Sequence, residues 1–360
     1  MKILRVINNL GIGGAERGVV DNLPLHLKNG ISIDLLLLDG VKTEFKKSLK
    51  KNYIKIYSLG KNISLRNPLL SLKLIKYLKK YDLIHVSLFP SLYWIALASL
   101  FIKKKPKLIF TEHATTNKRR NNFVFRIIDK LIYSRYDHIV FISDAVKNEF
   151  NNLKVNTVNT SVIYNGINFE NLNSRQKVDH NILKLVDNKT VILQVSGFRD
   201  EKDHITLIKA ISELDDSFIL LLVGDGKTIK ECKLLTKQLK IENKVLFLGN
   251  QKDVGSIIKI SDICVLSSFI EGFGRAAVEC MYLKKPVIGT NVSGLDHTIG
   301  DSGVLFEVGD YKKLASIIEA LTLDKDYYNL VANKCKKRAE QFDYKFMSIS
   351  YEKLYKKILE

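Results

Sequence analysis

The stretch Ser267-Ser-Phe-Ile-Glu271-Gly-Phe-Gly274-Arg-Ala-Ala-Val-Glu279-Cys-Met281 decides the fold of this chain. It follows a short apolar run, residues 263–266, which predicts a strand that enters a glycine loop and then a helix beginning near Arg275. The amides at such a helix start can hold an anion such as a diphosphate. Glu271 and Glu279 bracket this start, and carboxylates accept hydrogen bonds from neutral hydroxyl groups. The stretch therefore favours a ligand that carries both phosphates and hydroxyls, such as a sugar nucleotide.

Short apolar strand patterns alternate with amphipathic helix patterns along the whole chain, which predicts parallel sheets covered by helices on both faces. The chain has 360 residues, enough for about two domains. A polar, charged segment at residues 170–188 separates two series of strands. We expect a first α/β domain at residues 1–165, a second at 166–342, and a last helix at 343–360. The predicted strands are residues 3–8, 33–38, 54–59, 83–87, 108–111, 138–142, 161–164, 191–195, 218–223, 245–248, 263–266, 287–289 and 304–306.

Polar and glycine-rich clusters follow several of these strands, at the sheet edge where ligands of such folds bind. The cluster Gly11-Ile-Gly-Gly14 resembles a dinucleotide fingerprint but fails it, because Glu16 stands where a small residue is needed. It still lets a ligand approach backbone amides at a helix start. Gly224-Asp-Gly226 and Leu248-Gly-Asn250 also end strands and permit close backbone approach to a nucleotide. The alternative for each cluster is a tight turn without a ligand.

Three further side chains are candidates for chemistry. His113 ends a predicted strand, where it could bond a sugar hydroxyl or serve only as a structural histidine. Arg199 and Lys202 lie three apart on a loop between a strand and a helix. They can neutralise a departing diphosphate, or either can be a surface charge.

The net charge of +19 lies almost wholly in the first half of the chain. Residues 1–165 hold 28 Lys and Arg against 11 Asp and Glu, whereas residues 166–360 hold 29 against 27. A lysine-rich solvated surface would explain this excess, as would an anionic membrane, a lipid pyrophosphate or a nucleic acid. The run Lys118-Arg119-Arg120 could hold an acceptor phosphate or lipid headgroups. Aromatic-rich basic strands for base stacking are missing, so we expect no nucleic-acid partner.

Four scattered cysteines without a CxxC spacing predict reduced, buried thiols and no metal site. No secretory signal is recognised at the N-terminus. The longest apolar run, Val86 to Ile102, is interrupted by Pro90 and falls short of the roughly 20 residues of a spanning helix. We therefore expect a cytoplasmic protein.

The chain resembles family 4 of the retaining GT-B glycosyltransferases over nearly its whole length. The resemblance rests on Gly13-Gly-Ala-Glu-Arg17, His113, Phe141-Ile-Ser-Asp-Ala145, Tyr164-Asn-Gly-Ile167, Lys202-Asp-His204, Gly224-Asp-Gly226 and Glu271-Gly-Phe-Gly274 with Glu279. It implies two Rossmann-like domains whose parallel sheets face each other across a cleft. The second domain would bind a nucleotide-sugar, the first an acceptor, and the last helix would cross back onto the first domain.

The resemblance also implies roles for single residues. Glu271 would contact the hydroxyls of the donor sugar, and Glu279 would hold those of the ribose. Lys202 and the helix start would bind the diphosphate, and His113 would lie at the donor sugar and the acceptor. The remaining donor-binding candidates are Gly13, Gly14, Arg199, Gly224, Asn250, Gly272, Phe273, Gly274, Arg275 and Ala276; the acceptor-binding candidates are Arg17, Lys118, Arg119 and Arg120.

The chain departs from the family pattern at three places. Gly197 stands where the family usually has arginine, so Arg199 as the diphosphate arginine is a hypothesis. Arg275 replaces an apolar residue, and it either reaches the donor or favours solvent. The later loop reads Ser293-Gly-Leu-Asp-His297 instead of Gly-Gly-x-Pro-Glu, which leaves a carboxylate contact there open.

We expect a retaining glycosyltransferase that uses a nucleotide-sugar, by family habit a UDP-sugar, without a metal or another cofactor. The basic first half suggests a glycan or polyprenyl-pyrophosphate-linked acceptor and peripheral work at the inner face of the cytoplasmic membrane. The alternatives are another GT-B enzyme, such as an epimerase or hydrolase of sugar nucleotides, and a non-catalytic basic protein that binds membrane or RNA.

Overall fold

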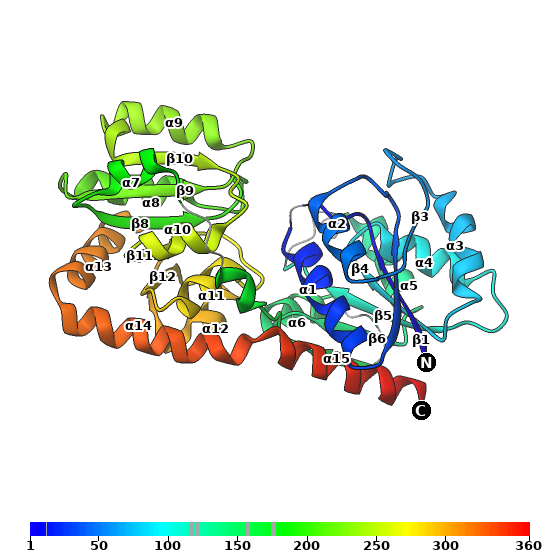
Figure 1. Ribbon diagram of the computed structural model, residues 1–360. Coiled ribbons are helices and arrows are strands. Elements are labelled where there is room, and N and C mark those ends of the chain that lie inside the picture. Colours follow the sequence, from blue (N-terminus) through cyan, green and yellow to red (C-terminus); the bar gives the residue numbers. More distant parts are fainter. Residues whose placement is uncertain (12, 116–118, 120–121, 154, 156–158, 174–177) are drawn as a thin grey trace. The chain divides into compact units, whose positions relative to one another are not determined.

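The computed structural model describes residues 1–11, 13–115, 119, 122–153, 155, 159–173 and 178–360. The chain forms two compact units (Figure 1). Unit 1 comprises residues 1–166 together with the C-terminal segment 344–360, and unit 2 comprises residues 167–343.

Unit 1 is built on a parallel sheet of seven strands among its described residues, in the order β3-β2-β1-β4-β5-β6-β7. The strands are β1 (Lys2–Ile7), β2 (Ser32–Leu37), β3 (Ile56–Ser58), β4 (Leu83–Ser87), β5 (Lys107–Glu112), β6 (His138–Phe141) and β7 (Asn159–Val162). The helices are α1 (Gly14–Lys28), α2 (Glu44–Lys51), α3 (Leu70–Leu78), α4 (Ser91–Ser99), α5 (Phe123–Tyr133), α6 (Asp144–Asn151) and the C-terminal α15 (Tyr344–Leu359).

Helix α15 belongs to unit 1 because its apolar face packs into the core of that unit. Met347, Tyr351 and Tyr355 are buried there together with Val19 and Leu23 of α1. The C-terminal end of the chain thus shares a core with its first strand and first helix.

Unit 2 repeats the same plan, with six strands in the part that the structure describes, in the order β10-β9-β8-β11-β12-β13. The strands are β8 (Thr190–Val195), β9 (Phe218–Val223), β10 (Val245–Gly249), β11 (Ile263–Leu266), β12 (Val287–Thr290) and β13 (Val304–Phe306). The α-helices are α7 (His180–Val186), α8 (His204–Glu213), α9 (Ile229–Gln238), α10 (Val254–Ile260), α11 (Arg275–Tyr282), α12 (Leu295–Ile299), α13 (Tyr311–Leu323) and α14 (Lys325–Ala339). Short 3₁₀ helices are η2 (Phe169–Asn173), η3 (Glu242–Lys244), η4 (Gly300–Ser302) and η5 (Glu340–Phe342).

The apolar runs form strands because both faces of each sheet are covered. Every residue of β9, Phe-Ile-Leu-Leu-Leu-Val, is buried, which is typical of a central strand in a two-faced parallel sheet. Short polar side chains begin the covering helices: Asp203 accepts a hydrogen bond from the Thr206 amide, and Asp310 accepts one from Lys313. The predicted α/β fold with two parallel sheets is confirmed.

Strand order reverses once in each sheet, between β1 and β4 in unit 1 and between β8 and β11 in unit 2. Loops that leave such neighbouring strands run to opposite faces of the sheet and open a crevice at the carboxyl ends. Each unit therefore has one place where a ligand is expected.

The cysteines are expected from the sequence to be buried thiols, and all four are free and buried. Most of the apolar run 86–102 folds as the end of β4 and the buried helix α4. Within the described residues, no helix combines the length and the hydropathy needed to cross a membrane.

Candidate functional site

The loops after β8 and β11 meet above the reversal point of unit 2. The Gln194 side chain, on β8, accepts a hydrogen bond from the Ser267 amide at 3.0 Å. The Asp203 amide donates to the Ser267 carbonyl at 3.1 Å, and the Phe269 amide donates to Glu201 at 3.0 Å. The two backbone bonds form a short antiparallel bridge between Lys202 and Ser268, so the two loops are held together.

Lys202 and Glu271 form an ion pair on these joined loops. The Lys202 ammonium also donates to Ser268 Oγ at 3.3 Å. The Lys202 and Glu271 side chains are 10% and 19% exposed, so the pair is largely screened from water yet still reachable. Side chains 69 residues apart thus place one cation and one carboxylate side by side at the sheet edge.

The glycine loop places Glu271 just before the start of α11. Gly274 caps this helix with φ +77°, a left-handed conformation that side chains rarely adopt. Gly294, at φ +98°, lies so close that an added Cβ would stand 2.3 Å from the Glu271 carbonyl. The Phe273 side chain is buried edge-on against Phe342. Buried packing on both sides therefore fixes the backbone between Glu271 and the helix.

The helix then presents the remaining candidates of this stretch. Gly272, Arg275 and Ala276 are half-buried around the start of α11. Amides in the first turn of a helix have no acceptor within the helix, so they suit an anion. Glu279 is half-buried one turn further along α11, near enough in sequence to serve the same ligand.

Gly224 and Gly226, which follow β9, lie so close to the backbone of the loop after β8 that a side chain would not fit at either position. A Cβ on Gly224 would lie 2.1 Å from the Ser196 carbonyl oxygen, and one on Gly226 would lie 2.2 Å from that of Phe198. The Phe198 amide donates to the Asp225 carbonyl at 3.0 Å. The loops after β8 and β9 are thereby joined through their backbones.

The other two donor-binding candidates of unit 2 are exposed. Arg199 lies on the loop after β8, three residues before Lys202, and its Nε would be 3.4 Å from a Cβ on Gly197. Asn250 follows β10, the edge strand, which is two strands away from the reversal point. Arg199 is therefore close to the Lys202–Glu271 pair along the chain, whereas Asn250 is at the margin of the sheet.

His204 packs against the loop that follows β8. Its ring stacks on Phe198 with centroids 4.0 Å apart, and its Nε2 lies 3.0 Å from Ser196 Oγ. Burial, together with the charge of Lys202, lowers the pKa of His204 to about 4. The ring is neutral at physiological pH and acts in packing.

Unit 1 has its own crevice, beside α1. Gly13 caps the N-terminus of α1, and Gly14 is its first residue. The Glu16 carboxylate folds back over Gly13, where an added Cβ would lie 2.2 Å from its oxygen. Arg17 pairs with Asp21 at 3.3 Å. The glycine turn before α1, which does not match the dinucleotide pattern, therefore has the Glu16 carboxylate at the helix start.

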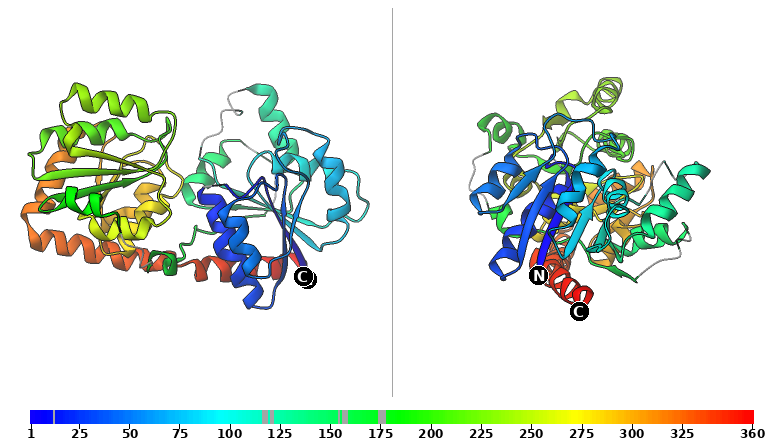
Figure 2. Two further views of the ribbon diagram at one scale, coloured as in Figure 1. Left: turned by 45° about the horizontal axis from the view of Figure 1, so that its top comes forward. Right: turned by 90° about the vertical axis from the view of Figure 1, so that its right-hand side faces the viewer.

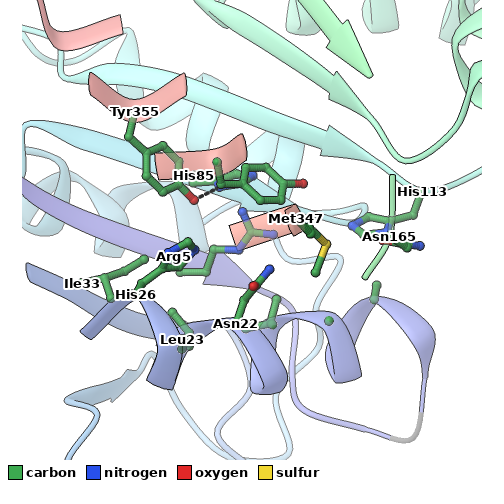
Figure 3. Close-up of a pocket in the computed structure, with 14 residues that line it drawn as sticks. Arg5, Asn22, Leu23, His26, Ile33, His85, His113, Asn165, Met347 and Tyr355 are labelled. Carbon is green, nitrogen blue, oxygen red and sulfur yellow. Dashed lines mark hydrogen bonds between the residues drawn. The ribbon is translucent and has the colours of Figure 1, made fainter. Parts of the chain in front are cut away.

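His113 lies in a pocket of unit 1 that is lined by α1, α15 and, among others, Arg5 of β1 and His85 of β4 (Figure 3). Its Nε2 is 3.4 Å from Ser87 Oγ, which accepts a 2.7 Å hydrogen bond from Arg5. Arg5 and Ser87 lie on the two strands that flank the reversal point, so the topology brings them beneath His113.

A fully buried histidine, His85, extends this network to α15. His85 is hydrogen-bonded to Tyr355 and to Thr111, both at 2.7 Å. Burial holds the pKa of His85 well below its usual range. Within the described residues, Arg5 Nη1 and Asn22 Oδ1 are buried without a hydrogen-bond partner, and both residues line the pocket in Figure 3.

Of the basic run proposed for the acceptor, Arg119 is described, while Lys118 and Arg120 lie outside the described residues. The Arg119 guanidinium stacks 3.7 Å from the Phe89 ring centroid and lies 3.8 Å from Asp129. Its guanidinium also lies 5.3 Å from the ring centroid of Tyr93, so Arg119 packs against α4 and α5 of unit 1.

Sequence reasoning missed Arg5, Ser87, Ser268 and Gly294. Ser87 and Ser268 were detectable as polar residues at or just after strand ends beside the reversal points, but their partners lie far away in sequence. Among the described residues, no group of three or more His, Cys, Asp or Glu side chains is placed to hold a metal ion.

Comparisons with known proteins fit this architecture. The family model described as "Glycosyltransferase Family 4" matches residues 12–171, and "Glycosyl transferases group 1" matches residues 175–342. The chain is 28% identical over 77% of its length to the N-acetyl-alpha-D-glucosaminyl L-malate synthase of Bacillus anthracis, and covers 75% of that protein.

Another relative is the Campylobacter jejuni N-acetylgalactosamine-N,N'-diacetylbacillosaminyl-diphospho-undecaprenol 4-alpha-N-acetylgalactosaminyltransferase, 27% identical over 94% of both chains. Among solved structures, HepE of Anabaena in complex with UDP and glucose matches 99% of both chains with a TM-score of 0.86 and 23% identity. At this identity the match shows the fold.

Proposed function

We propose that this chain, which belongs to the family 4 glycosyltransferases, transfers a sugar from a UDP-sugar to a glycan carried on a polyprenyl diphosphate. The relatives support this, since one is named for a diphospho-undecaprenol acceptor. The fold neighbour from Anabaena was solved with UDP. The reaction would contribute to a surface polysaccharide, with the enzyme working at the inner face of the cytoplasmic membrane.

The Lys202–Glu271 pair is the observation that carries the proposal. It sits where the strand order of unit 2 reverses, the place where α/β sheets bind ligands. In the free enzyme each side chain satisfies the other. In the donor complex, Lys202 would turn to the diphosphate and Glu271 would accept hydrogen bonds from sugar hydroxyls.

Charge stabilisation is the chemistry this site would supply. When the sugar leaves, negative charge builds up on the terminal phosphate of UDP. The Lys202 ammonium and the first-turn amides of α11 would stabilise that charge, with Arg199 as a further cation. Protein groups would do this work without a metal ion, and Glu279 would hold the ribose hydroxyls.

We propose that the transfer retains the configuration of the anomeric carbon. The acceptor hydroxyl oxygen would bond to that carbon on the face from which the phosphate oxygen departs. The hydroxyl proton would pass to the leaving phosphate oxygen, which balances the reaction without a glycosyl-enzyme. His113, steadied by Ser87, and the basic side chains Arg17 and Arg119 would serve the acceptor in unit 1.

A donor screen tests the proposal. The purified protein is incubated with a panel of UDP-, GDP- and TDP-sugars, and nucleotide release is followed with and without a membrane lipid extract. Release from one UDP-sugar that the extract stimulates is the expected result. Equal release without extract would indicate hydrolysis or a soluble acceptor, and an absence of both release and nucleotide binding would refute a transferase.

A further inference from the structure

Helix α5 exposes apolar side chains to solvent along one face. Phe123, Ile127 and Leu131 are 73%, 45% and 65% exposed, and Val124 beside them is 60% exposed. Phe123, Ile127 and Leu131 are spaced four residues apart, so they form one stripe that is about 12 Å long. We call these four residues the α5 stripe.

The opposite face of α5 already serves the core of unit 1. Asp129, Ile132 and Tyr133 are buried, and the Tyr133 hydroxyl donates to Glu112 at 2.5 Å. The α5 stripe therefore lies on the side of the helix that does not face the core. A contiguous exposed apolar face on a soluble unit marks a surface that something else covers.

Basic side chains flank the stripe. Arg126 and Lys130 are exposed one helical turn apart on α5. At the far end of the helix, Lys105 donates to the Arg135 carbonyl at 2.8 Å. This contact brings the loop with the exposed Lys103 and Lys104 beside α5.

Two more apolar side chains adjoin the same end. Arg135 reaches Ser99 at 3.5 Å, which places the C-terminal end of α4 next to that of α5. Leu100 and Phe101, which follow α4, are 57% and 62% exposed. In both views of Figure 2, α5 lies on the outside of unit 1, beyond the sheet.

We propose that α5 is a membrane-docking helix, which lays the α5 stripe into the headgroup region of an anionic bilayer. Apolar side chains bordered by Lys and Arg, on a helix too short to span, are the chemistry of an interfacial helix. The described acidic side chains near the stripe are engaged within the unit, with Asp129 bonded to Tyr93 and Asp137 paired with Lys105. The inference deepens the proposed function by naming the surface on which the lipid-linked acceptor is met.

The full chain is tested by vesicle sedimentation, with phosphatidylglycerol-containing and pure phosphatidylcholine vesicles. The test variant is Ile127→Glu/Leu131→Glu. The control is Leu234→Glu/Leu323→Glu, which makes the same charge change at exposed leucines of α9 and α13 in unit 2. We expect the wild type and the control to bind the anionic vesicles, and the test variant to bind at least about tenfold more weakly.

A second variant separates charge from apolar contact. Arg126→Gln/Lys130→Gln should bind the anionic vesicles about fivefold more weakly for each charge removed. Its vesicle binding should also depend less on the salt concentration than that of the wild type. Binding of UDP and thermal unfolding should stay unchanged in every variant, which separates this proposal from that for the donor site. Equal vesicle binding by the test variant, or no binding by the wild type, would overturn it. So would a dimer that dissociates in the test variant while vesicle binding persists, since the stripe would then be a self-association surface.

Discussion

Lys202 and Glu271 are ion-paired across the two loops that leave β8 and β11. The pairing depends on the strand order, because β8 and β11 are neighbours although three α-helices, one 3₁₀ helix and two strands separate them in the chain. Each partner lowers the cost of holding the other out of water. The pair thus holds a cation and a carboxylate side by side, as the proposed binding of a diphosphate and of sugar hydroxyls would require.

Replacing either member should slow transfer strongly without unfolding the protein. We expect Glu271→Gln and Lys202→Met each to lower kcat by about 10²–10³-fold, as removal of a charge-stabilising group does elsewhere. The double variant should lose little more, because both act in one step. Glu201→Gln, an exposed carboxylate on the same loop, is the control. Near-wild-type turnover of Glu271→Gln would refute the site.

Glu279 should govern the nucleotide rather than the sugar. Loss of its carboxylate in Glu279→Gln should weaken the binding of UDP itself by about tenfold, the value of one charged hydrogen bond. Glu271→Gln should bind UDP as the wild type does. Calorimetric titration with UDP makes the comparison, and the opposite ranking of the two variants would exchange their roles.

Much of this architecture could be predicted from local patterns. Continuous apolar runs such as residues 218–223 predict buried strands, and the glycine loop predicts the start of α11 at Arg275, which the structure confirms. The ends of strands are predicted less accurately. The pattern predicts a strand at residues 54–59, whereas β3 covers only Ile56–Ser58. Edge strands have fewer neighbours to fix their length.

Contacts that depend on strand order could not be predicted. Arg5 meets Ser87 because β1 and β4 are adjacent, and the two residues lie 82 apart in the sequence. Gly294 reads as a turn residue, yet its need for glycine comes from the Glu271 carbonyl on another loop. Such requirements follow from tertiary packing, which no local pattern records.

Gly224 should be far less tolerant of a methyl group than a glycine of positive φ that has open space around it. Gly224→Ala would press its Cβ against the Ser196 carbonyl at φ +141°. Backbone cannot yield as a side chain does, so we expect a loss of about 3 kcal/mol or more. Gly309→Ala, at φ +84° with nothing within 4 Å, should cost about 1 kcal/mol. Urea unfolding compares them, and equal losses would contradict the close approach of the loops.

Stability should fall as the solution becomes acidic. His204 and His138 are buried, and burial lowers the pKa of each to about 4. In the unfolded chain both titrate near about pH 6.5. Between these values the unfolded state binds more protons, so the free energy of unfolding decreases from about pH 6.5 down to about pH 4.

A histidine variant isolates the part of this slope that comes from unit 2. His204→Gln should show less loss than the wild type over that range, by about 2 kcal/mol. His180→Gln, at an exposed position, should keep the full slope. Chemical denaturation at several pH values provides the measurement, and parallel curves for wild type and His204→Gln would show that His204 is not the source.

The stereochemistry of the product tests the central claim most directly. The wild-type enzyme is given its UDP-sugar and acceptor, and the anomeric proton of the transferred sugar is followed by NMR from the first turnover. The account predicts that the new linkage has the anomeric configuration of the donor, formed as UDP is released. A product of the opposite configuration, or UDP release with free sugar as the sole product, would contradict it.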